Sequence, residues 1–132
     1  MRIGIDLRYL SHGLMGGVHT YMLHLAPALA CAGPNDDFVF YADTKQPFEI
    51  DPLPKNVTLR LLSYRTPFSA LANDLRLRSL MAADSLDVAH FPANYGFGPA
   101  GTPSLITLHD EINLLPLISI LRGHRKDPRT LA

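Results

Sequence analysis

Apolar and polar residues alternate along this chain with two different periods, one typical of strands and one typical of helices. In the stretch RIGIDL (2–7) every second residue is apolar, which predicts a strand. From Val18 onward, apolar residues recur at three- and four-residue spacing, which predicts a helix that ends at AGPNDD (32–37). The expected inward face of this helix consists of Val18, Tyr21, Met22, Leu25, Ala28 and Leu29.

The remaining elements follow the same two patterns. Thr66 followed by Pro67 is typical of a helix start and predicts a second helix that runs to about Asp84. PSLITLH (103–109) is almost continuously apolar, which favours a strand in the buried middle of a parallel sheet. Three further strands are predicted at FVFYA (38–42), VTLRLL (57–62) and LDVAHF (86–91). The second helix is expected to turn Phe68, Leu71, Ala72 and Leu75 inward.

The order of these elements predicts an α/β fold. Strands alternate with helices as β-α-β-β-α-β-β, which favours a Rossmann-like layered domain with a mostly parallel sheet. We expect a long crossing loop or a short helix between the strands 38–42 and 57–62. The domain is predicted to span residues 1–121, and the basic tail 122–132 is expected to be the start of a longer continuation.

Composition excludes several classes of function. The 132 residues include 12 Lys and Arg against 12 Asp and Glu, so the formal net charge is zero and no nucleic-acid partner is expected. The single cysteine, Cys31, permits no internal disulfide; we interpret it as a small buried residue, which fits a cytoplasmic location. No signal peptide or membrane span is predicted. Asn56-Val57-Thr58 matches a glycosylation sequon, which we interpret as a chance match.

Three loops are expected to meet at one edge of the sheet, because ligands of open α/β sheets bind where the strands end. These loops are residues 8–17, 92–101 and 109–111. In the first, Gly16-Gly17 precedes a helix whose free N–H groups favour a phosphate, and glycine lets that phosphate approach the backbone. The alternative is a tight turn between strand and helix. Spacing alone favours the turn.

Histidines supply the other candidate chemistry. His109 ends an apolar stretch and precedes Asp110. The pair either faces a ligand, or His109 is structural and Asp110 caps the next helix. The sequence favours neither interpretation over the other. His90 lies within a predicted strand and is interpreted as structural. His19 and His24 are five residues apart, which does not match the i, i+4 spacing of metal ligands, so no metal site is predicted.

Three stretches of the chain together resemble a known family. MRIGIDLRYLSHGLMGGVHTYMLHLAPALA, DVAHFPANYGFGP and PSLITLHDEINLLP are similar, in this order, to the N-terminal domain of retaining glycosyltransferases of the GT-B fold, family-4 (group 1) type. The shared features are a first strand with Asp-x-Arg, a Gly-Gly before an aromatic-containing helix, and a later strand that ends in His-Asp. The resemblance covers most of residues 1–121.

The resemblance implies a sugar transfer between two Rossmann-like domains that face each other across a cleft. The N-terminal domain mainly takes a sugar, lipid-linked or polysaccharide acceptor, and the C-terminal domain binds the nucleotide-sugar donor, usually without a metal or other cofactor. Gly16 and Gly17 would then present backbone N–H groups to the donor diphosphate. His109 and Asp110 would be the catalytic residues beside the transferred sugar. The acceptor-side candidates are His12, Asn94 and Tyr95.

The chain also departs from the family pattern. The C-terminal domain with its paired glutamates is missing, so this chain is not expected to catalyse transfer alone, and peripheral membrane association would concern the full-length protein. The alternative function is a non-catalytic α/β binding module, or a fragment that pairs with a partner chain. A dinucleotide-binding oxidoreductase is less favoured, because no G-x-G-x-x-G follows the first strand.

Overall fold

The chain folds into the predicted Rossmann-like α/β layers. The computed structural model describes residues 1–12, 16–45, 50, 52–66 and 68–109. The elements are β1 (Arg2–Asp6), the short 3₁₀ helix η1 (Arg8–His12), α1 (Gly17–Ala32), β2 (Asp37–Asp43), β3 (Val57–Leu62), α2 (Phe68–Ala83), β4 (Val88–Phe91) and β5 (Ser104–Ile106). Both helices and all five strands lie where the periodicity predicts them, with ends shifted by a few residues.

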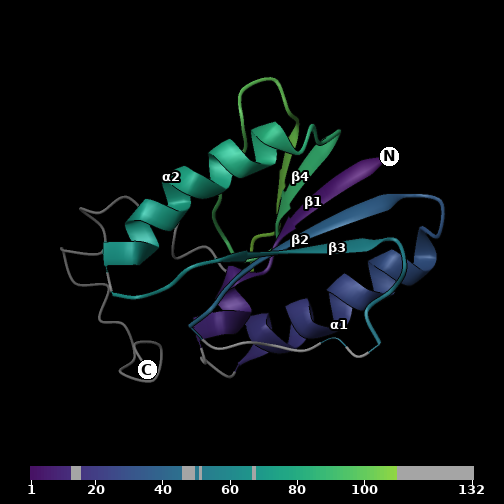
Figure 1. Cartoon of the computed structure of the whole chain (residues 1–132). Helices are drawn as coiled ribbons and strands as arrows, with labels where there is room; N and C mark the ends of the chain where they lie inside the picture. Colours follow the sequence, from purple (N-terminus) through teal and green to yellow (C-terminus); the bar gives the residue numbers. More distant parts are fainter. Residues whose placement is uncertain (13–15, 46–49, 51, 67, 110–132) are drawn as a thin grey trace.

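The five strands form one sheet in the order β3-β2-β1-β4-β5, and every neighbouring pair is parallel. Figure 1 shows α1 and α2 on opposite faces of this sheet. The chain moves outward from β1 to β3 and then returns to the other side of β1 with β4, so the strand order reverses between β1 and β4. Such a reversal leaves a crevice at the carboxyl ends of the strands. The described residues of the connection 44–56 contain no helix; residues 46–49 and 51 lie outside the described part of the chain, so the choice between a crossing loop and a short helix stays a prediction.

The α1 face of the sheet holds one of the two hydrophobic clusters. Met22 is buried as predicted, but Tyr21 and Ala28 are exposed, and the two alanines Ala26 and Ala30 are buried in their place. Alanine suits these positions because it lets the helix lie close to the sheet. The strands supply most of the other buried residues of this cluster, which are Ile5, Leu7, Phe38, Phe40 and Val57.

The inward face of α2 differs from the prediction. Ala72 and Leu75 are exposed, whereas Leu77 and Met81 pack against strand residues such as Val39 and against Leu86, which precedes β4. The prediction failed because α2 carries apolar residues on more than one side, so its sequence does not select a face. The side chains of Phe68 and Leu71, which were also expected to face inward, lie outside the described structure.

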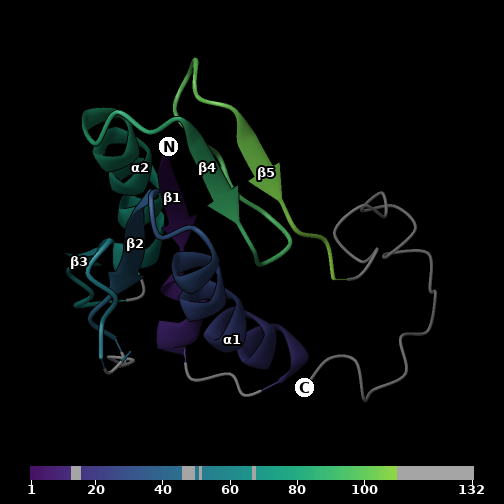
Figure 2. The same ribbon diagram turned by 90° about the vertical axis from the view of Figure 1, so that its right-hand side faces the viewer.

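Two further burial predictions are wrong. The strand expected over 103–109 is only three residues long, lies at the edge of the sheet and exposes Ser104, Leu105 and Ile106 (Figure 2). Apolar composition cannot distinguish an edge strand from a central one, because the strand order depends on the other elements. Cys31 is exposed on the last turn of α1 instead of buried. Within the described part of the chain, neither helix is long and apolar enough to cross a membrane.

The carboxyl end of α1 is closed by Asn56, which precedes β3. Its side-chain amide donates hydrogen bonds to the backbone carbonyls of Ala30, Gly33 and Asp36 at 3.0, 3.0 and 3.1 Å. The Gly33 carbonyl also accepts from the backbone N–H of Asp36 at 3.0 Å, and the Asn56 amide adds a partner for carbonyls at and beyond the end of the helix, where the helix ladder supplies none. The amide nitrogen of the sequon is thus committed to a structural role, in agreement with a chance match.

A second polar cluster lies between the sheet and the end of α2. Asp84 accepts a hydrogen bond of 2.8 Å from the hydroxyl of the fully buried Tyr41 and pairs with Arg60 at 2.8 Å. Burial alone would raise the pKa of Asp84. The hydrogen bonds from Arg60 and Tyr41 outweigh it and hold this pKa below its usual value of 3.8. The carboxylate therefore stabilises the folded state above about pH 4.

We predict that Asp84→Asn lowers the free energy of unfolding by about 1–2 kcal/mol at pH 7, because the charge-assisted hydrogen bonds are lost. The difference from the unmodified protein shrinks as the pH falls below about 4, and it disappears only below the lowered pKa of Asp84 in the folded state, where the carboxyl group is protonated in both states. Urea unfolding between pH 3 and pH 7 measures this difference. Asp37→Asn, the same change at an exposed position, serves as the control, and a difference that does not vary with pH would contradict the assignment.

Candidate functional site

A cavity of about 60 Å³ opens at the carboxyl ends of the strands, where the strand order reverses. It has room for about four to six water molecules. Its wall is formed by the last residues of β1, β2 and β4, by residues that follow β1 and β4, and by one turn of α2. The polar side chains that line it include Asp6, Arg8, Asp43, Asn73, Asp74 and Tyr95.

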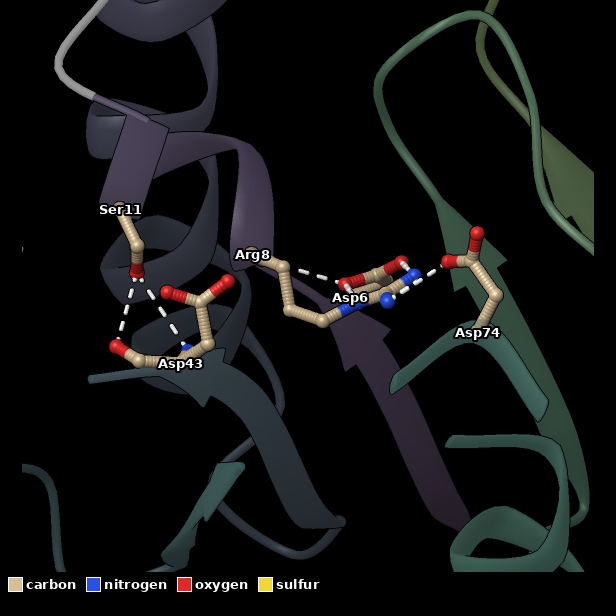
Figure 3. Close-up of polar contacts among 5 residues, drawn as sticks. All are labelled: Asp6, Arg8, Ser11, Asp43 and Asp74. Atoms are coloured by element: carbon tan, nitrogen blue, oxygen red, sulfur yellow. Dashed lines mark hydrogen bonds and ion pairs between the residues drawn. The ribbon is translucent and has the colours of Figure 1, made fainter. Parts of the chain in front are cut away.

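Arg8 is held by two carboxylates in this cavity (Figure 3). Its Nε and Nη2 donate to the two oxygens of Asp6 at 2.9 and 2.8 Å, and its Nη1 donates to Asp74 on α2 at 2.7 Å. The bidentate pair fixes the plane of the guanidinium. Burial alone would lower the pKa of Arg8, but the hydrogen bonds and charges of Asp6 and Asp74 raise it above its usual value. The ion pairs join the end of β1 to α2.

The neighbouring strand end is fixed by Ser11 of η1. The fully buried Ser11 hydroxyl donates to the Asp43 carbonyl at 3.0 Å and accepts from the Asp43 N–H at 3.4 Å (Figure 3). The Asp43 carboxylate in turn accepts from the N–H of Lys45 at 3.0 Å. β1 and β2 are adjacent strands, and Asp43 lines the same cavity as Asp6.

His109 is positioned by the loop that follows β4. Its backbone N–H donates to the side-chain oxygen of Asn94 at 2.6 Å, and its ring Nε2 lies 2.7 Å from the carbonyl oxygen of Pro92. A carbonyl oxygen only accepts, so Nε2 carries the proton and Nδ1 of the neutral ring is an acceptor. The ring also meets that of Tyr21 edge to face at 4.9 Å. Asn94 adopts a left-handed φ of 64°, which asparagine tolerates better than most residues.

Gly16 and Gly17 lie at the N-terminus of α1. Gly16 has an extended backbone with φ 177°, which any residue can adopt, and neither glycine lies in the left-handed region of φ that favours glycine. A Cβ built on either glycine meets no described atom within 4 Å. Backbone strain and packing against the described residues therefore do not explain the two glycines. Residues 13–15, which would form the rest of a tight turn, lie outside the described part of the chain, so both interpretations of the glycines stay predictions.

The structure brings several of the predicted site residues together. Asn94 contacts His109 directly, and Tyr95 lines the cavity next to them. Tyr21, one turn into α1 from Gly17, links that helix to His109. His12 ends η1, and its side chain lies outside the described structure, as does the whole of Asp110.

His90 is structural, as predicted. It is buried in β4 and its Nε2 lies 2.9 Å from the hydroxyl oxygen of Thr107. Burial lowers its pKa, so the neutral ring is favoured. The contact joins β4 to the residue that follows β5.

The acidic residues of the cavity were missed by the sequence interpretation. The sequence analysis includes Asp6 and Arg8 only as part of the Asp-x-Arg pattern and does not single out Asp43. The rule that ligands bind beyond strand ends would have selected Asp6 and Asp43. No signal in the sequence marks Asn73 and Asp74, because polar residues on a helix are usually exposed to solvent.

Within the described residues, no group of three or more His, Cys, Asp or Glu side chains could hold a metal ion. Comparison with protein-family models finds no match for this chain, and comparisons with curated proteins and with solved structures find none either. A function for the chain therefore has to be inferred from its own residues.

Proposed function

We propose that this chain forms the acceptor-side half of an enzyme that transfers a sugar from a nucleotide-sugar donor to an acceptor hydroxyl. One observation carries the proposal: the polar cavity, the positioned His109 and the helix that begins at Gly17 meet around the carboxyl edge of one parallel sheet. This is the edge at which such sheets bind ligands.

The proposed roles follow from the chemistry of each part. The acceptor occupies the cavity next to Tyr95, with His12 and Asn94 on the same side. The acceptor oxygen forms a bond to the anomeric carbon of the donor, the bond from that carbon to the diphosphate breaks, and the hydroxyl proton leaves with the diphosphate. The N–H groups at Gly16 and Gly17 stabilise the leaving negative charge. His109, and Asp110 after it, lie beside the transferred sugar.

A second domain that faces this edge would bind the nucleotide in the proposed enzyme. The two sides would align the acceptor hydroxyl with the anomeric carbon, which supplies much of the rate enhancement in such reactions. We therefore expect this chain by itself to bind substrate fragments weakly, with dissociation constants on the order of 1 mM, about −4 kcal/mol. A measurement of binding is more informative for this chain than an assay of transfer.

We predict that uridine diphosphate shifts the amide resonances of Gly16 and Gly17 in an NMR titration, and that Gly17→Ala weakens this binding several-fold. A methyl group at this position obstructs the approach of a phosphate to the backbone. The same variant is expected to unfold at the same denaturant concentration or a higher one, because alanine favours the helix by up to about 1 kcal/mol and meets no described atom.

Uridine without phosphate is the control ligand and should leave these amides unshifted. Loss of stability in Gly17→Ala would show that the glycine is required by the fold. Equal shifts with uridine and its diphosphate, or no shift at all, would contradict the diphosphate contact. Binding of saccharide without any binding of diphosphate would favour the alternative of a non-catalytic binding module.

A further inference from the structure

Asn94 holds a backbone conformation that is unfavourable for a residue with a side chain. It lies in the loop after β4 with a φ of 64°, and the N–H of Tyr95 donates to the Ala93 carbonyl at 2.8 Å, which closes a turn of three residues around it. Glycine adopts such a φ without steric cost, whereas a residue with a Cβ does not. The asparagine side chain therefore contributes something at this position that glycine could not, as is common for strained residues at functional sites.

The side chain of Asn94 extends the pairing between β4 and β5 beyond both strands. In a parallel sheet, a residue donates its N–H to a carbonyl of the neighbouring strand and accepts, through its own carbonyl, the N–H two residues further on. Asn94 makes the same pair of bonds: its backbone N–H donates to the Thr107 carbonyl at 3.0 Å, and its side-chain oxygen accepts from the N–H of His109 at 2.6 Å. The side-chain oxygen thus takes the place of a backbone carbonyl and fixes the backbone of His109.

The imidazole of His109 is held by two further contacts. Its Nε2 lies 2.7 Å from the carbonyl oxygen of the buried Pro92, and its ring meets that of Tyr21 edge to face. The ring reaches both partners only from the backbone position that the Asn94 bond fixes. Because the Pro92 carbonyl only accepts, the neutral ring carries its proton on Nε2, and Nδ1 is the acceptor.

We propose that Asn94 is a positioning residue for His109. It fixes the His109 backbone so that the Pro92 carbonyl holds the ring proton on Nε2. Nδ1 is then the ring atom offered to a ligand, and it takes a group that donates a hydrogen bond. Asn94 acts through His109 and needs no contact with a substrate. In its consequence for catalysis the proposal rests on the proposed function, because His109 lies there beside the transferred sugar.

The test is the ¹⁵N spectrum of the histidine rings of the whole chain without ligand. It is recorded at about pH 9, where a histidine of ordinary pKa, about 6.5, is neutral. A fixed tautomer gives two widely separated nitrogen shifts, whereas a ring that exchanges between tautomers gives averaged shifts that lie closer together. We expect His109 to show the wide separation of the Nε2–H form. His24, which is exposed on α1, is the internal reference for the averaged pattern.

Asn94→Gly removes the side-chain oxygen but suits the left-handed φ, so this variant is expected to keep an unfolding midpoint close to that of the unmodified protein. Its two His109 ring shifts should approach those of His24, because the ring is no longer held against the Pro92 carbonyl. Asn94→Asp keeps an acceptor oxygen and tolerates the same φ, and should retain the wide separation. Asn35→Gly, the same change at an exposed turn position, should leave the His109 ring unchanged.

Four results would overturn the proposal. They are a His109 ring in the Nδ1–H form in the unmodified protein, unchanged ring shifts in Asn94→Gly, averaged ring shifts in a folded Asn94→Asp variant, and ring shifts in Asn94→Gly that change only in step with a loss of folded protein. The last of these would assign Asn94 a purely structural role.

The proposed function fails independently of these results. It is contradicted when uridine diphosphate does not shift Gly16 and Gly17 and when glucose, as a saccharide probe, does not shift the amides of Tyr9, Ala93 and Tyr95 around the cavity. The ring shifts of His109 are measured without either ligand, so the failure of one proposal is distinguished from the failure of the other.

Discussion

Replacing Arg8 with methionine is expected to lower the free energy of unfolding by about 2–4 kcal/mol. Methionine keeps much of the aliphatic packing but leaves Asp6, whose side chain is 13% exposed, without its bidentate partner. The tie from β1 to Asp74 on α2 is lost in the same step. Urea unfolding at pH 7 measures the change, and the affinity for glucose should fall as the cavity wall loosens.

Arg78→Met provides the control for this prediction, because Arg78 is exposed on α2, the helix that carries Asp74. Its effect should stay within about 0.5 kcal/mol. The double variant Arg8→Met with Asp6→Asn should recover part of the lost stability, since no charge is then left unpaired at Asp6. Equal stability of Arg8→Met and Arg78→Met would contradict the role of Arg8 as the element that holds the cavity together.

Replacing Asn56 with aspartate is expected to cost about 2–4 kcal/mol of unfolding free energy. The substitution removes the amide that donates to three backbone carbonyls and places a carboxylate against them. The negative end of the α1 dipole is also close by, which makes the added charge more unfavourable. The change is measured by thermal or denaturant unfolding, with loss of helical signal as the expected readout.

Thr58→Ala separates the structural role of Asn56 from its place in a sequon. Thr58 is exposed, and its replacement removes the sequon while the hydrogen bonds of Asn56 remain. The protein should then keep nearly all of its stability. An Asn56→Asp variant as stable as Thr58→Ala would show that the three carbonyls do not depend on the amide.

The fold class could be predicted from the sequence, because each helix and strand is marked by the spacing of apolar residues within its own segment. Alternating apolar residues in β1 and the helical spacing in α1 identify the elements, and their succession along the chain favours a parallel sheet. Which face of a helix is buried, and which strand lies at the edge of the sheet, could not be predicted equally well. Leu75 is exposed and Leu77 is buried although both are leucines of α2, because only the position of the sheet decides between them.

The contacts of the site are harder to predict from the sequence, because they join residues that are far apart along the chain. Arg8 and Asp74 are 66 residues apart, and nothing near either residue indicates the other. His109 was expected directly at the end of a strand, whereas β5 already ends at Ile106, and the partners Pro92 and Asn94 lie in a loop whose path depends on β4. The strand-end rule identifies the edge of the sheet, whereas the chemistry of the cavity requires the three-dimensional structure.

The central claim is that one sheet edge binds a saccharide and a diphosphate side by side. It is tested most directly by titrating uridine diphosphate into the chain in the presence of saturating glucose, with NMR detection. The claim predicts that the diphosphate shifts Gly16 and Gly17 while the glucose-induced shifts at Tyr9, Ala93 and Tyr95 persist. Displacement of glucose by the diphosphate, or diphosphate shifts at the opposite edge around Asp37 and Asp87, would contradict it.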